Sequence, residues 1–182
     1  MLERMLVEHA APTLARLKTG SLVQLPVRDE QAFRPEYEAL RLRLAPKGVQ
    51  LRLYRMRGRA LVYLFRPDRL HKTLACPRVQ ALLGQYGYDA FTAEEALDRL
   101  GMRLEASEDF PHEIGVFLGY PIDDVESFIE HGGRNFAACG CWKAYHNVCE
   151  ARRIFAWYAK CRDVYTRLYR DGRSIDRLTV AA

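Results

Sequence analysis

The residues best suited to a chemical role lie between Phe110 and Gly133, in the run FPHEIGVFLGYPIDDVESFIEHGG. His112 follows a proline that suits the first turn of a helix, where the positive end of the helix dipole favours a neutral imidazole. Such an imidazole can accept a proton or bind a metal ion. We therefore predict His112, Glu113 and His9 as catalytic candidates. The alternative is that His112 only caps the helix or packs against it.

A second set of candidates would hold an anionic ligand. Residues 49–56 and 59–66 alternate with period two around Arg57 and Gly58, which predicts a hairpin with a two-residue turn. In this register Arg52 lies opposite Tyr63, on a face that is both basic and aromatic. Such a face suits a planar anionic ligand or nucleic acid, unless a helix covers it. The predicted ligand-binding residues are Thr13, Arg52, Arg59, Tyr63, Arg66, Lys143 and Tyr145.

The cysteines and histidines near the C-terminal half do not form a strong metal motif. Cys139, Cys141 and Cys149 lie near His131 and His146, but the paired CxxC spacing typical of zinc sites is missing. We therefore predict no metal site. The sequence also contains no phosphate-binding loop, GxGxxG, GxSxG or HExxH motif, so the corresponding nucleotide, hydrolase and metalloprotease classes receive no support.

The composition is that of an ordinary globular protein. The chain has 182 residues, of which 49% are hydrophobic and 28% are charged. We expect one α+β domain over residues 1–182, cytoplasmic, with no membrane span, no signal peptide and five reduced thiols.

The positive charge is concentrated in one segment. Between Arg41 and Lys72 the chain has ten Lys or Arg and a single acid, Asp68, whereas the whole chain carries +5. A basic segment of this kind suits nucleic acid, a ligand with phosphates or carboxylates, or an acidic partner protein. It is equally typical of a solvated surface.

Hydrophobic periodicity and helix stop signals predict the order of the elements. The predicted helices are 2–18, 35–44, 67–74, 77–83, 93–104, 111–118, 121–131 and 148–169, and the predicted strands are 22–27, 49–56, 59–66 and 136–145. Pro12 should kink the first helix, and Thr92 should cap the helix at 93–104. Asp109 should cap the helix at 111–118, and Gly119 should end it. In the helix at 121–131 we expect Asp124 in the first turn and a buried stripe of Ile122, Val125, Phe128 and Ile129. Leu51, Leu53, Val62 and Leu64 form the expected core face of the hairpin. The fold class is therefore α+β, with a small, mainly antiparallel sheet of about four strands and helices packed against it.

Several runs resemble one family over nearly the whole chain. HEIGVFLGYPIDDVESFIE, CGCWKAY and GRSIDRL, together with HAAPTLARLKTG and RALVYLFRP, are similar to the bacterial domain-of-unknown-function family numbered 3793. The chain departs from the family where Ala10 replaces a cysteine, where Arg16 replaces a small residue and where Cys141 replaces an aromatic. The resemblance implies an association with flavodoxins and with iron-related genes.

Three functions are consistent with these residues. The first is binding, with or without transformation, of an anionic planar small molecule such as a tetrapyrrole or a flavin, so that haem or flavin is the expected cofactor class. The second is a nucleic-acid-binding module that uses the basic hairpin at 49–66. The third is an adaptor for an acidic redox partner such as a flavodoxin-like protein. We favour the first.

Overall fold

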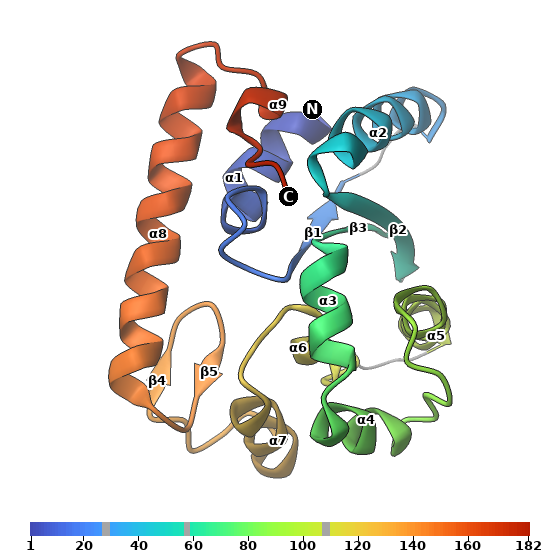
Figure 1. Ribbon diagram of the computed structural model, residues 1–182, viewed down its shortest axis with the longest axis vertical. Helices are drawn as coiled ribbons and strands as arrows, with labels where there is room; N and C mark the ends of the chain where they lie inside the picture. The colour runs from blue at the N-terminus through green and yellow to red at the C-terminus, as the bar shows by residue number, and fades with distance from the viewer. Residues whose placement is uncertain (27–29, 57–58, 107–109) are drawn as a thin grey trace. The chain divides into compact units, whose positions relative to one another are not determined.

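The computed structural model describes residues 1–26, 30–56, 59–106 and 110–182 (Figure 1). The chain divides into two compact units: Met1–Pro67 with Lys160–Ala182, and Asp68–Ala159. The predicted α+β class is confirmed, because helices dominate and the strands form a three-stranded and a two-stranded antiparallel sheet.

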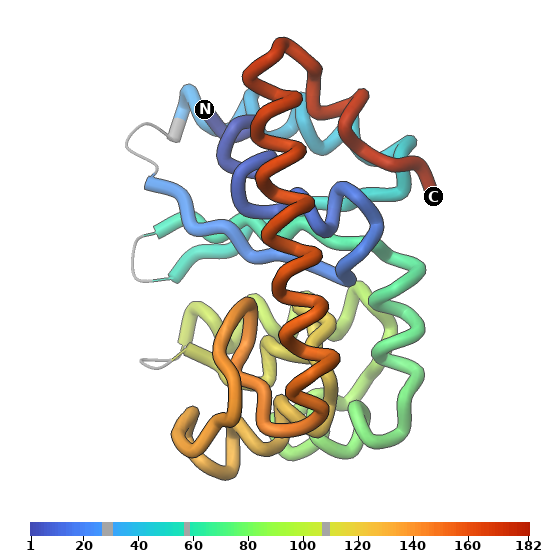
Figure 2. The backbone as a smooth tube through the Cα atoms, turned by 90° about the vertical axis from the view of Figure 1, so that its left-hand side faces the viewer, coloured from blue at the N-terminus to red at the C-terminus, as the bar shows by residue number. Residues whose placement is uncertain are grey.

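The first unit is built on the three-stranded sheet. Its elements are α1 (Leu2–Leu14), β1 (Gly20–Leu25), α2 (Glu30–Leu44), a 3-10 turn η1 (Ala45–Lys47), β2 (Gln50–Met56), β3 (Arg59–Phe65), the C-terminal part of α8 (Val148–Arg170) and α9 (Ile175–Leu178). The strands pair in the order β1-β3-β2, all antiparallel (Figure 1). Figure 2 shows the same strands as blue and teal segments of the backbone.

The predicted register of the hairpin is confirmed. Leu51 lies opposite Leu64, and Arg52 lies opposite Tyr63. Because side chains alternate across a strand, this register turns one set of residues toward the helices of the unit. The core on that face includes Leu6, Leu14, Leu40, Leu44, Leu51, Val62, Leu64 and Ile175. The predicted turn at residues 57–58 lies outside the described residues.

The N-terminal helix ends earlier than predicted. We expected it to reach Lys18 with a kink at Pro12, but α1 includes that proline and ends at Leu14. Arg16 then takes a left-handed backbone conformation, with φ 61°, and the amides of Leu17 and Lys18 donate to the Pro12 carbonyl. The Pro12 carbonyl therefore accepts from residues five and six positions later instead of from Arg16, and the helix ends in a turn.

Two further boundaries in this unit differ from the prediction. Strand β1 is Gly20–Leu25 instead of 22–27, and α2 begins at Glu30 and contains Pro35. Pro35 is the sixth residue of α2, so it lies beyond the first turn and removes one i→i−4 hydrogen bond from the helix. The helix continues on both sides of this proline, so the proline does not mark its first residue as we predicted.

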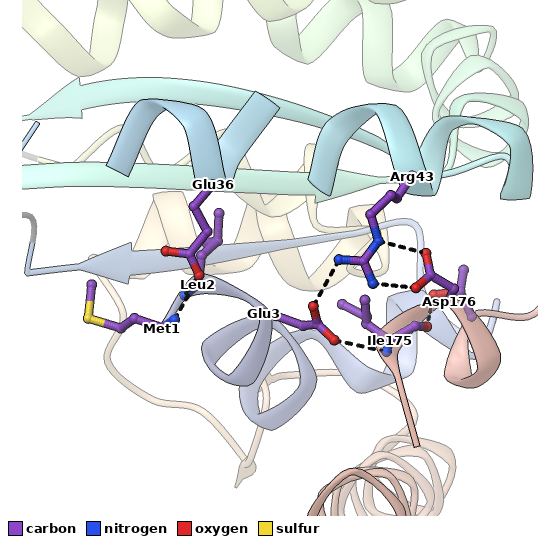
Figure 3. Close-up of polar contacts among 8 residues, drawn as sticks. Met1, Leu2, Glu3, Glu36, Arg43, Ile175 and Asp176 are labelled. Carbon is purple, nitrogen blue, oxygen red and sulfur yellow. Dashed lines mark hydrogen bonds and ion pairs between the residues drawn. The ribbon is translucent and has the colours of Figure 1, made fainter. Parts of the chain in front are cut away.

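Ion pairs at the surface join several elements of the first unit. Arg43 of α2 donates to Glu3 of α1 at 3.1 Å and to Asp176 of α9 at 3.2 Å (Figure 3). The other Glu3 oxygen accepts from the amide of Ile175 at 3.1 Å. The hydrogen bond from Arg43 lowers the pKa of the Asp176 carboxyl. Three elements that are distant in sequence are joined by this network.

The second unit is mainly helical. Its elements are α3 (Pro67–Leu74), α4 (Pro77–Gly84), α5 (Ala93–Ala106), α6 (Ile114–Phe117), α7 (Ile122–His131), the strands β4 (Ala138–Cys139) and β5 (Lys143–Ala144), and the N-terminal part of α8. The predicted cap of α5 is present, since the Glu95 amide donates to the Thr92 hydroxyl at 3.3 Å.

Two predictions in this unit are wrong. The chain from 136 to 145 is not one strand but a short hairpin, in which Cys139 pairs with Lys143. The helix expected from Pro111 is only the four residues of α6, because Pro111 and His112 form hydrogen-bonded turns before it. Asp109, the residue expected to cap it, lies outside the described residues.

Among the described residues, no helix has a stretch long and apolar enough to span a bilayer.

Candidate functional site

The second unit contains a pocket of about 360 Å³, lined mainly by aromatic and apolar side chains. Its volume falls in the range of small-molecule sites, roughly 300–1,000 Å³. The lining comes from the turn before α6, from α6 and α7, and from the β4–β5 hairpin. The lining residues are Phe110, His112, Ile114, Gly115, Leu118, Tyr120, Asp124, Val125, Phe128, Cys139, Gly140, Cys141, Trp142 and Lys143.

The corner between α6 and α7 sets the shape of one wall. Gly119 has φ 73°, which a glycine adopts without strain, and it ends α6 as predicted. The next residue, Tyr120, stacks on Trp142 with ring centroids 5.4 Å apart. Gly115 lies so close to Val125 that an added Cβ would be 2.9 Å from a methyl group. Helices α6 and α7 therefore pack closely at Gly115. Tyr120, one residue after Gly119, adds an aromatic ring to the pocket wall.

Asp124 is the main polar support of the pocket. It is only 3% exposed. One carboxylate oxygen accepts the indole N–H of Trp142 at 2.7 Å, and the other accepts the amides of Tyr145 and His146 at 2.8 and 2.9 Å. A buried carboxylate needs such donors, because water no longer solvates it. The three bonds fix the hairpin and the indole ring against α7.

The turn of the hairpin is fixed by two further contacts. The Tyr120 hydroxyl donates to the Cys141 carbonyl at 2.7 Å. Burial raises the pKa of that phenol, so it remains a neutral donor. Gly140 lies against the ring of Phe155, where an added Cβ would be only 2.3 Å from a ring carbon. The backbone between Cys139 and Trp142 is therefore closely held.

The two basic residues of the lining are His112 and Lys143. The His112 side chain is exposed, and its ring meets Phe128 edge-on at 5.1 Å. The Lys143 ammonium donates to the Gly133 carbonyl at 2.7 Å and lies 4.9 Å from the ring centre of Phe136. An ammonium has three N–H donors, so a further acceptor can be bound by the same group. The structure thus brings two of the predicted site residues to one pocket.

Glu113 lies outside this lining, although it is adjacent to His112. Its side chain is 0% exposed, and it pairs with Arg103 of α5. The Tyr88 hydroxyl also donates to it, at 3.3 Å. Burial, reinforced by the Glu113 charge, raises the pKa of Tyr88. These contacts indicate that Glu113 joins α5 to the turn before α6.

Tyr145 is also absent from the pocket lining. Its ring lies 5.6 Å from that of His131, and its hydroxyl is buried without a hydrogen-bond partner among the described residues. Tyr145 contributes to the site through its backbone amide, which donates a hydrogen bond to Asp124.

The remaining predicted site residues belong to the first unit. Arg66 is 0% exposed, and its guanidinium donates to the carbonyls of Thr13, Leu14 and Val180 at 2.9, 2.6 and 2.8 Å. A further nitrogen donates to the Lys47 carbonyl at 2.9 Å. The contacts of Arg66 therefore show a structural role, in which one side chain joins the ends of α1, η1 and the C-terminus.

The hairpin face in this unit combines buried rings with more accessible arginines. Tyr63 is buried and stacks on Phe65 with ring centroids 5.0 Å apart. Arg52 is half-buried across from it, and Arg59 is exposed at the start of β3. Tyr63 is 0% exposed, so its ring offers no surface on which a ligand or a base can stack.

The two other predicted residues of this unit come from α1. Thr13 is buried, and its hydroxyl lies 2.9 Å from that of Ser21. His9 is exposed. Thr13 therefore packs within the fold, whereas the His9 side chain remains accessible.

Sequence reasoning missed the aromatic wall and its support. We assigned Asp124 only to the first turn of a helix, and we expected Ile122, Val125, Phe128 and Ile129 to be the buried stripe of that helix. In the structure Asp124 and Val125 are the buried residues of α7. A useful signal would have been Trp142, because a buried indole N–H needs a hydrogen-bond acceptor, and Asp124 is that acceptor in the structure.

Across residues 1–26, 30–56, 59–106 and 110–182, no group of three or more His, Cys, Asp or Glu side chains is placed to hold a metal ion.

Comparisons with known proteins give a single family. The model of DUF3793, described as a protein of unknown function, matches residues 6–179. Neither a search of curated proteins nor a search of solved structures found a match.

Proposed function

The chain belongs to the DUF3793 family, and for this member we propose that the pocket of the second unit binds an anionic planar small molecule with a flavin-like ring system. The observation that carries this proposal is the composition of the pocket wall. Aromatic rings form the wall, and one ammonium and one imidazole belong to it.

Flat rings in the lining favour a flat ligand. Tyr120 and Trp142 are stacked. The indole also contacts Phe155 edge-on, with ring centroids 4.5 Å apart, and donates a hydrogen bond to Asp124. Aromatic faces interact best with other rings in stacked or edge-on arrangements. Because the indole is fixed by a hydrogen bond, little side-chain freedom is lost when a ligand stacks on it.

The charges of the lining favour an anion. Asp124 is the acidic residue of the lining, and its oxygens already accept three N–H donors. Lys143 and His112 are then the groups that an anionic substituent would meet. A negatively charged oxygen can accept from the ammonium in a charge-assisted hydrogen bond.

The volume favours the smaller of the two ligand types considered. About 360 Å³ lies near the lower end of the range for small-molecule sites. A three-ring flavin head fits this limit better than a tetrapyrrole with four pyrrole rings. A redox or iron-related role would follow from the chemistry of such a cofactor.

Titration of the purified protein with flavin mononucleotide, and separately with haem, tests this proposal. We expect saturable flavin binding that weakens about tenfold or more in Lys143→Met, which removes the charge but keeps an apolar stem. His112→Ala should weaken binding without loss of the fold, because that side chain is exposed.

Lys160→Met is the matched control, since Lys160 is an exposed residue outside the lining. It should bind flavin like the unmodified protein. Equal affinity in the Lys143 and Lys160 variants would contradict the proposed anion contact, and absence of any saturable flavin binding would contradict the ligand class.

A further inference from the structure

We infer that Cys139 and Cys141 form a redox-active dithiol, which a low-molecular-weight disulfide converts into an internal disulfide at the pocket wall. Both are free cysteines, and both line the pocket. This inference does not depend on the identity of the pocket's ligand.

The spacing of the two cysteines is compatible with the Cα separation that a disulfide needs. One residue separates them, so their Cα atoms are at most about 7 Å apart even in an extended chain. The segment is not extended, because Cys139 ends β4 and the Gly140 amide donates to the Trp142 carbonyl at 3.0 Å within the turn. Disulfides need Cα distances of about 4.4–6.8 Å. Both residues also line one cavity.

The surrounding contacts present this thiol pair in a fixed position. The Cys141 carbonyl accepts from Tyr120, Gly140 lies against the Phe155 ring, and Trp142 is bound to Asp124. Residues 140–142 are therefore held by Asp124 of α7, by Tyr120 of the loop before α7, and by Phe155 of α8. Holding reactive groups in place raises their effective concentration and favours the internal reaction over reaction with a second small molecule.

The two thiols differ in access, which sets the order of the steps. Cys139 is exposed and Cys141 is half-buried. The Cys139 thiolate attacks one sulfur of a disulfide RSSR, the S–S bond breaks, and one RS⁻ leaves and takes up the proton from Cys139. Cys141 then attacks the Cys139 sulfur and releases the second RSH. The protein dithiol is oxidised by two electrons, and RSSR is reduced to two RSH.

The test uses oxidised glutathione and intact-mass measurement of the full chain in a Cys149→Ser background. That background removes the other exposed thiol, which lies outside the pocket lining. We expect a product that has lost two hydrogen atoms and contains no glutathione. Peptide mapping should place the disulfide between Cys139 and Cys141. In the further variant Cys141→Ser, glutathione should remain attached to Cys139, because no second thiol can release it.

Two results would overturn the inference. One is a stable glutathione adduct on Cys139 while Cys141 is still present. The other is a pair that stays reduced at oxidised-glutathione concentrations that modify Cys139 in the Cys141→Ser variant. Flavin titration of the reduced protein is a separate measurement, so failure of the thiol reaction leaves the ligand proposal standing, and the reverse also holds.

Discussion

The indole Nε1 of Trp142 donates a hydrogen bond of 2.7 Å to the buried carboxylate of Asp124, and this pair joins the β4–β5 hairpin to α7. The same carboxylate accepts two backbone amides from the end of the hairpin. One acidic side chain thus orients a ring of the pocket wall and fixes the backbone beside it.

Replacement of Asp124 by Asn should destabilise the second unit. An amide has one oxygen, so at least one of the three donors would face an NH₂ group and lose its acceptor. We expect a loss of about 1–3 kcal/mol in the free energy of unfolding, measured by denaturant titration. Asp123→Asn is the control, because Asp123 pairs with Arg78 at the surface. That change should cost under about 1 kcal/mol, and equal losses would contradict the assigned role of Asp124.

Replacement of Gly140 by Ala should disturb the turn between the cysteines. The added methyl group would lie 2.3 Å from the Phe155 ring, so the ring or the turn must move. Overpacking of this kind costs about 1–3 kcal/mol, which should appear as a lower thermal midpoint. Gly84→Ala is the control, since its added Cβ meets nothing within 4 Å. A Gly140→Ala protein as stable as Gly84→Ala would show that the turn is not constrained.

Part of this architecture could be predicted from sequence. The hairpin register followed from period-two alternation, and the end of α6 followed from Gly119, because both are local signals. The role of Asp124 could not be predicted. Its burial depends on Trp142, which lies eighteen positions later and on another element. Likewise, nothing local distinguishes Arg66 from the exposed arginines of the basic segment.

Arg66→Met should strongly destabilise the first unit. The buried guanidinium donates to the carbonyls of Thr13, Leu14 and Val180, and its removal leaves these acceptors without that donor. We expect a loss of about 3 kcal/mol or more in the free energy of unfolding, because several groups are affected together. Arg59→Met, at an exposed position, should stay within about 0.5 kcal/mol. Near-equal stability of both variants in denaturant would refute the structural role of Arg66.

The reactivity of Cys161 should depend steeply on pH. Burial raises the pKa of this thiol to about 11. At about pH 8 roughly one molecule in a thousand then carries the reactive thiolate, and the fraction rises about tenfold per pH unit up to the pKa. Alkylation by iodoacetamide, followed by peptide mapping, should therefore modify exposed Cys149 well before Cys161. Equal rates for the two cysteines at about pH 8 would contradict this assignment.

The tryptophans allow the pocket proposal to be tested at the site itself. The chain has two of them, Trp142 in the pocket wall and Trp157, which is 56% exposed and lies outside it. In Trp157→Phe all tryptophan emission comes from the pocket wall. Trp142→Phe, in which the exposed ring remains, is the reciprocal control.

Fluorescence titration of Trp157→Phe with flavin mononucleotide is therefore the most direct test of ligand binding. We predict saturable quenching of Trp142 emission, with weaker affinity when Lys143→Met is added, and little quenching of the exposed tryptophan in Trp142→Phe. Flavin binding that leaves Trp142 emission unchanged, or no saturable quenching in Trp157→Phe, would contradict the proposal that this pocket holds a planar anion.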